Sequence, residues 1–122
     1  MSTRLIKVAE ATGPALDWLV ATIEHRRIHG VQMVTVVDRD VGWLGRFSHR
    51  YSTDWAQGGP IIEREGIYLW RPYGALGAWS AKLDDWPNER VVHADTSLIA
   101  AMRCYVISKL GPEVEVPEEL LT

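Results

Sequence analysis

Features that mark several classes of protein are scarce or missing in this chain. It contains one cysteine, Cys104, which excludes an intrachain disulfide and fits a reducing compartment. No apolar run approaches the roughly 18 residues that a membrane span needs, and we expect no signal peptide at the N-terminus. The net charge of −3 gives no excess of positive charge, which argues against broad electrostatic binding to nucleic acid.

The composition that remains is typical of a globular protein. The 122 residues suit one domain over 1–122, with 47% hydrophobic and 24% charged residues. A disordered chain would combine lower hydrophobicity with a larger net charge. Six tryptophans stand against one phenylalanine. Indole is preferred where a large flat surface also needs a hydrogen-bond donor.

The spacing of apolar residues predicts two helices. The first covers about 13–26 after Thr12 as N-cap, and the second covers 97–110 between a cap at Asp95 or Thr96 and a stop at Gly111-Pro112. The buried stripe of the first helix is Leu16, Leu19, Val20 and Ile23. The stripe of the second is Leu98, Met102, Tyr105, Val106 and Leu110.

Short runs rich in β-branched and alternating apolar residues predict the strands. They are residues 4–9, 31–37, 67–71, 78–83, 91–94 and 114–116. Residues 38–51 are interpreted as a hairpin arm or a loop, and 72–77 as a turn. This order predicts an α+β domain, with a mostly antiparallel sheet and two helices packed on one face.

The segment 51–65 carries the pattern that most resembles a functional site. Asp54 and Gln57 have the spacing of a capping box, and Gly58-Gly59-Pro60 would then end a single helical turn. This purely structural interpretation leaves Trp55 unexplained. Trp55 offers a flat face to a base or sugar, and adjacent glycines allow a ligand close to the backbone.

Three blocks of sequence form specific motifs: Ala-Thr-Gly-Pro-Ala-Leu-Asp-Trp (11–18), Ser-Thr-Asp-Trp-Ala-Gln-Gly-Gly-Pro-Ile-Ile-Glu-Arg-Glu (52–65), and the helix 98–111 followed by Glu-Val-Glu-Val-Pro. Together they resemble the NinX-like phage proteins. The middle, 66–95, departs from the family pattern. The resemblance implies a small protein of phage or prophage origin and does not imply an activity.

Two arginines complete the candidate site. Arg103 lies within an otherwise apolar helix; it either pairs with a carboxylate such as Glu63 or Asp17, or points toward residues 54–59 and binds an anion. Arg50, with Arg46 and His49, would form a cationic rim. The predicted ligand-binding residues are therefore Asp54, Trp55, Gln57, Gly58, Gly59, Arg103 and Arg50.

Catalytic and metal sites find little support in the sequence. Cys104 has no catalytic signature around it and is interpreted as a small buried hydrophobic residue. His25 and His29 are four apart, but Gly30 follows and no third ligand is evident, so we expect no metal and no cofactor. Asp54, Glu63 and Glu65 could hold a divalent ion in a nuclease-like site, which remains a third alternative.

The sequence thus predicts a non-enzymatic protein that binds a nucleotide-like anion. In the cytoplasm of an infected bacterium, such a protein could sequester a nucleotide signal of host defence. The alternative is an interaction protein that binds a host or phage protein or single-stranded nucleic acid through its tryptophans. We also expect a homo-oligomer, most simply a two-fold dimer, because small domains bury little surface and surplus aromatics favour interfaces.

Overall fold

The computed structural model describes residues 2–29, 49–72, 78–87 and 90–121. The strand predicted over 31–37 and most of the segment 38–51 lie outside these residues. Within them the helices are α1 (Gly13–His29), α3 (Trp55–Glu65) and α4 (Ser97–Leu110). The strands are β1 (Thr3–Lys7), β2 (Tyr68–Trp70), β3 (Trp79–Lys82), β4 (Val92–Ala94) and β5 (Glu113–Pro117). Two 3-10 turns, η1 (Val8–Glu10) and η3 (Glu118–Leu121), complete the order.

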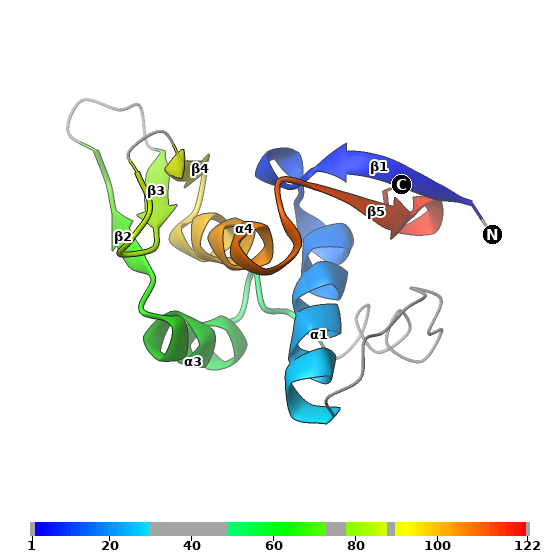
Figure 1. Ribbon diagram of the computed structural model, residues 1–122, viewed down its shortest axis with the longest axis horizontal. Coiled ribbons are helices and arrows are strands. Elements are labelled where there is room, and N and C mark those ends of the chain that lie inside the picture. Colours follow the sequence, from blue (N-terminus) through cyan, green and yellow to red (C-terminus); the bar gives the residue numbers. More distant parts are fainter. Residues whose placement is uncertain (1, 30–48, 73–77, 88–89, 122) are drawn as a thin grey trace.

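The predicted α+β class with antiparallel pairing is confirmed, but the described strands form two sheets rather than one. β1 pairs with β5, bringing Leu5 opposite Glu115 near the two ends of the chain (Figure 1). β2, β3 and β4 form the other sheet, in that order, with Leu69 opposite Ala81 and Ala81 opposite Val92. The strands on either side of the turn predicted over 72–77 therefore pair as expected, while residues 73–77 lie outside the described residues.

Helix α4 is the centre of the fold. It contacts α1, α3 and all three strands of the β2–β4 sheet (Figure 1). Its bounds are those that the sequence predicts, and the hydroxyl of Thr96 accepts from the backbone N–H of Ile99 as the predicted N-cap. Eight of its residues are buried, from Leu98 to Val106, so contacts on several sides hold it in place. Helix α4 therefore fixes the positions of α1, α3 and the β2–β4 sheet relative to one another.

Helix α1 follows the predicted stripe and is longer than predicted. Leu16, Leu19, Val20 and Ile23 are all buried, as expected. The prediction that the helix ends at about residue 26 is wrong, because it continues to His29. It begins at Gly13, which adopts φ of +57°, a left-handed conformation that glycine tolerates without a steric penalty.

Helix α3 is the main departure from the predicted elements. Gly58-Gly59-Pro60 was expected to end a single turn, but the helix continues through all three residues to Glu65 and ends at Gly66, with φ of +67°. The amphipathic stretch packs on α4, with Gly58 and Ile61 buried. This tertiary contact outweighs the poor helix propensity of glycine and proline.

Candidate functional site

A tightly bonded turn joins Arg50 to the start of α3. The carbonyl of Arg50 accepts from the backbone N–H groups of Thr53 (3.1 Å) and Asp54 (2.7 Å), and its own N–H donates to Oε1 of Gln57 (2.7 Å). Asp54 is the N-cap, as predicted, and its Oδ1 accepts from the N–H of Ala56 (2.9 Å). The amide of Gln57 donates to Oδ2 of Asp54 (3.4 Å). The polar side chains of this motif thus hold the turn and the helix start.

The two adjacent glycines differ in their surroundings. A Cβ atom at Gly58 would stand 2.5 Å from the carbonyl oxygen of Tyr51 and 2.6 Å from Cδ2 of Leu98. The nearest neighbour of such an atom at Gly59 is Cε3 of Trp55, at 3.7 Å. The close approach at Gly58 is therefore made by the protein's own chain, and it brings α3 against α4.

Trp55 borders a hollow at the N-terminal ends of two helices. We call it the Trp55 hollow; it has a volume of about 270 Å³ and is lined by Ser52, Thr53, Trp55, Thr96, Ser97, Leu98 and Ile99. The pairs Gly58–Leu98 and Arg64–Tyr105 show that α3 and α4 run in the same direction, so their N-termini meet here. Trp55 is 55% exposed. An indole face and side-chain hydroxyls therefore surround one opening, at the capped starts of two helices.

A buried carboxylate supports the floor beneath this turn. Oδ1 of Asp17 accepts from the N–H of Ser52 (2.8 Å), and both residues are buried. Burial raises the pKa of Asp17, while the bond from Ser52 and the charges of His49 and Arg50 act in the opposite direction. The Ser52 hydroxyl is buried beside this carboxylate and finds no hydrogen-bond partner of good geometry among the described residues.

Arg103 is directed elsewhere. Its Nε donates to the carbonyl of Ala11 (2.8 Å) and its Nη1 to the carbonyl of His93 (2.9 Å). These bonds tie α4 to the segment before α1 and to β4. Neither Glu63 nor Asp17, the partners expected from the sequence, receives this guanidinium, and Arg103 does not line the Trp55 hollow. Backbone carbonyls as partners leave no signal in an amino-acid sequence.

A polar network that the sequence did not reveal lies at the opposite ends of the same helices. The carboxylate of Glu24 accepts from Nη2 of Arg64 (2.7 Å) and from the hydroxyl of Tyr105 (2.6 Å). Burial raises the pKa of Glu24, but the bonds from Arg64 and Tyr105 outweigh it, so the net pKa lies below the ordinary value. Arg64 also pairs with Glu65, which pairs with Lys109. The network joins α1, α3 and α4.

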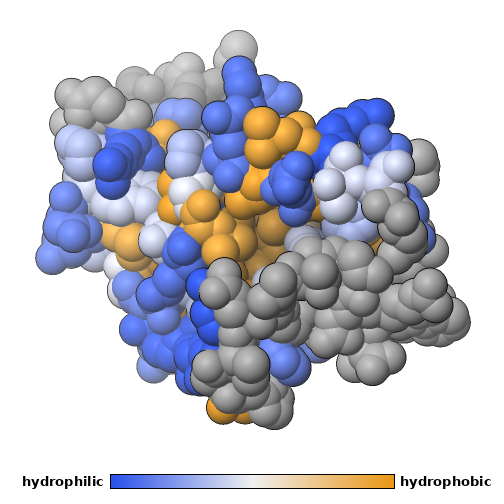
Figure 2. All heavy atoms as spheres, turned by 45° about the vertical axis from the view of Figure 1, so that its right-hand side comes forward, coloured by the Kyte–Doolittle hydropathy of each residue, from blue (hydrophilic) through white to orange (hydrophobic). Residues whose placement is uncertain are grey.

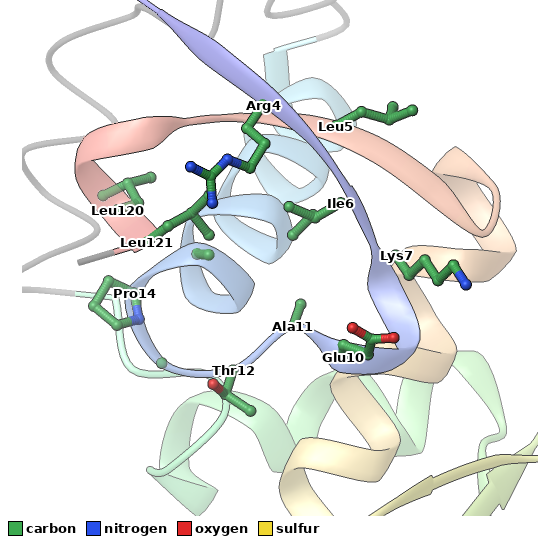
Figure 3. A pocket seen from close by; sticks show the side chains of 12 residues that line it. Arg4, Leu5, Ile6, Lys7, Glu10, Ala11, Thr12, Pro14, Leu120 and Leu121 are labelled. Atoms are coloured by element: carbon green, nitrogen blue, oxygen red, sulfur yellow. The ribbon is translucent and has the colours of Figure 1, made fainter.

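A larger hollow lies beside the two-stranded sheet. We call it the β1 hollow; it measures about 660 Å³ and lies between β1, the start of α1 and η3. Figure 3 shows Ile6 pointing into it and the Arg4 guanidinium reaching over it toward Leu121, whereas Leu5 points away. Hydrophobic atoms gather at the centre of this side of the molecule, with hydrophilic atoms around them (Figure 2). Its lining is mixed: Arg4, Lys7 and Glu10 contribute charged groups, and Ile6, Leu120 and Leu121 contribute apolar ones.

The groups considered for catalysis are placed as follows. Cys104 is buried, as predicted, and burial raises the pKa of its thiol to about 12. The hydroxyl of Ser80 is hydrogen-bonded to Nδ1 of His93 (2.9 Å), but Ser80 is buried and closed to a substrate. Among the described residues, no three His, Cys, Asp or Glu side chains are grouped to hold a metal.

These observations define a small α+β protein built around one central helix, with one hollow beside Trp55 and another beside β1. None of its described helices has the length and hydrophobicity to cross a membrane. A family model described as bacteriophage P22 NinX matches residues 7–109. The chain therefore belongs to the NinX family and is a small phage protein. The matched range includes 66–95, which the motifs alone left unassigned. No curated protein matches the chain.

Proposed function

We propose that this protein binds a nucleotide-like anion in the Trp55 hollow, without catalysing a reaction on it. The observation that carries the proposal is the exposed indole of Trp55 at the meeting point of two helix N-termini. The indole offers a stacking face to a base, and the first turns of α3 and α4 favour negative charge. Neither helix has an acidic residue in its first turn.

The residues around the Trp55 hollow have different roles in this proposal. Thr53 and Ser97 offer hydroxyls to a phosphate or a sugar, and Arg50 supplies positive charge from the adjoining turn. Asp54 and Gln57 hold the turn by their mutual bond and by the bond to the Arg50 N–H. Gly58 allows the two helices to approach. In this proposal Arg103 acts only by fixing α4, which supplies three of the seven lining residues.

The biological setting extends this proposal. A phage protein that holds a nucleotide without converting it is suited to lower the free concentration of that nucleotide. In the cytoplasm of the host bacterium, the natural target of such a protein is a nucleotide signal of host defence. Sequestration requires only affinity and abundance, which agrees with a site made of stacking and hydrogen-bonding groups.

A titration with defined probes tests the binding. We expect isothermal titration calorimetry to detect binding of linear or cyclic nucleotides to the wild-type protein, and no binding of the corresponding free ribose. Trp55→Ala should weaken this binding at least tenfold, because base–aromatic stacking contributes about 1–3 kcal/mol. Trp70→Ala is the matched control, since Trp70 is another exposed tryptophan on a different element. Equal nucleotide affinity of wild type and Trp55→Ala would remove the proposal.

A second candidate function is supported by the β1 hollow. The apolar side chains Ile6, Leu120 and Leu121 in its lining, and the hydrophobic atoms that Figure 2 shows on that side, favour a protein partner. A second copy of this chain is the partner that requires no other component, which agrees with the expected two-fold dimer. The two candidates use different sides of the fold, and they are separable by mutation.

A further inference from the structure

A basic hollow lies where the last turns of three helices meet. It has a volume of about 340 Å³ and is lined by Ile23, Arg26, Arg27, Glu65, Tyr105 and Lys109. This volume is at the lower end of the range of small-molecule sites, roughly 300–1,000 Å³. Ile23 and Tyr105 give it a buried apolar wall, and three cations surround the opening. It lies at the opposite ends of α3 and α4 from the Trp55 hollow.

The cations of this hollow are not balanced by the carboxylates near it. Arg26, Arg27, Lys109 and the neighbouring Arg64 face two carboxylates, Glu24 and Glu65. Arg64 lies 2.7 Å from the carboxylate of Glu24 and 2.9 Å from that of Glu65. The other two ion pairs are longer, at 3.4 Å for Arg27 with Glu24 and 3.3 Å for Lys109 with Glu65. The cluster therefore carries a surplus of positive charge in a protein whose net charge is −3.

Arg26 is the cation of this cluster that has no partner among the described residues. Its Nε atom is buried and makes no hydrogen bond. Within the described part of the chain, no hydrogen bond or ion pair engages this side chain. A desolvated guanidinium nitrogen without an acceptor is costly, and arginine is well suited to bind a phosphate with paired N–H groups.

The positions of these cations have a structural explanation that accounts for part of the pattern. Cations in the last turn of a helix interact favourably with the negative end of its dipole. One such cation for each helix would serve this purpose at any point on the surface. This interaction with the helix dipole does not require three helices to converge on one hollow. It also does not require the Nε atom of Arg26 to be buried and unpaired.

We infer that the basic hollow is a second binding site, specific for a small molecule that carries a phosphate monoester. Arg26 would hold the phosphate, Arg27 and Lys109 would add charge at the rim, and the wall of Ile23 and Tyr105 would contact the organic part. The site is separate from the Trp55 hollow and does not depend on the function proposed for it.

Calorimetry with ribose 5-phosphate, inorganic phosphate and neutral ribose, at one ionic strength, tests the inference. We expect ribose 5-phosphate to bind and ribose not to bind. We expect inorganic phosphate to bind more weakly than ribose 5-phosphate. Equal affinity of the two would contradict specificity for a phosphate monoester. Failure of both phosphates to bind would overturn the inference.

Two variants locate the site. Arg26→Gln should weaken phosphate binding at least tenfold with an unchanged or higher melting temperature, because the lost guanidinium has no partner in the protein. Arg71→Gln, at an exposed arginine beyond β2, is the matched control and should bind as wild type does. Trp55→Ala should also leave ribose 5-phosphate binding unchanged, so that the two sites can fail independently. Wild-type affinity in Arg26→Gln would contradict the assignment.

Discussion

At the scale of single residues, the two adjacent glycines give a matched pair of substitutions. Gly58→Ala places a methyl group 2.5 Å from a backbone carbonyl, which cannot move as a side chain can. We expect it to lower the free energy of unfolding by about 1–3 kcal/mol. Gly59→Ala meets only an ordinary contact and improves helix propensity, so it should raise stability by up to about 1 kcal/mol.

Chemical denaturation of the two glycine variants beside wild type measures both effects. If Gly58→Ala were as stable as Gly59→Ala, the close packing of α3 on α4 would be refuted. Because Gly58 fixes the relative position of these helices, its loss should also weaken nucleotide binding, while Gly59→Ala should bind normally.

Trp55 distinguishes a site from a core position. A buried tryptophan replaced by alanine costs about 3–5 kcal/mol. Trp55 is more than half exposed, so we expect Trp55→Ala to melt within a few degrees of wild type. Thermal denaturation followed by circular dichroism checks this. A protein that fails to fold after this substitution would show that Trp55 is structural.

At the same scale, the sequence predicted those residues whose roles are local. Asp54 and Thr96 follow from the spacing between a cap and its helix, and both cap as expected. Gln57 differs from the predicted capping box, because its side chain accepts from the N–H of Arg50 and not from the N–H of Asp54. The partners of Arg103 and Glu24 lie up to 92 residues away along the chain. No local pattern encodes such contacts, and they could not be predicted.

At the scale of elements, the network of Glu24, Arg64 and Tyr105 connects three helices. The folded-state pKa values of Glu24 and Glu65 lie below the ordinary value of 4.5. Both carboxylates therefore add stability above about pH 4.5, and this contribution is lost as the pH falls through their folded-state pKa values. Asp17, whose pKa is raised, contributes in the opposite direction.

Glu24→Gln should isolate this contribution. At pH 7 we expect a loss of about 1–3 kcal/mol in the free energy of unfolding, since Arg64 and Tyr105 lose a charged partner. Between pH 5 and pH 3 the variant should lose less stability than wild type, so the two curves should converge. Urea unfolding across this pH range tests the expectation, and parallel curves would contradict it. Glu63→Gln, on the exposed side of α3, is the control.

The elements themselves were predictable to different degrees. Helix α4 has strong caps and a long apolar stripe, and its bounds were predicted correctly. Helix α3 contains two glycines and a proline, so its local propensity is poor and only its packing on α4 explains it. Strand positions were visible as short apolar runs. Their division into two sheets depends on long-range pairing, such as Thr3 opposite Pro117.

At the scale of the whole molecule, the expected dimer can be tested at β1, on the face that points away from the β1 hollow. Leu5 is 58% exposed on β1, and Ile28 is 63% exposed at the far end of α1. We expect light scattering to give a dimer mass for wild type at micromolar concentration. Leu5→Glu should shift the mass to that of a monomer, while Ile28→Glu should not. A monomeric wild type would exclude the dimer.

The central claim is that the Trp55 hollow retains a nucleotide-like molecule in an infected cell. The most direct measurement compares wild type and Trp55→Ala, each purified from infected bacteria and then denatured, with the released small molecules identified by mass spectrometry. The account predicts an intact nucleotide released from wild type in near-equimolar amount and absent from Trp55→Ala. A chemically converted product, or no nucleotide released from wild type, would contradict it.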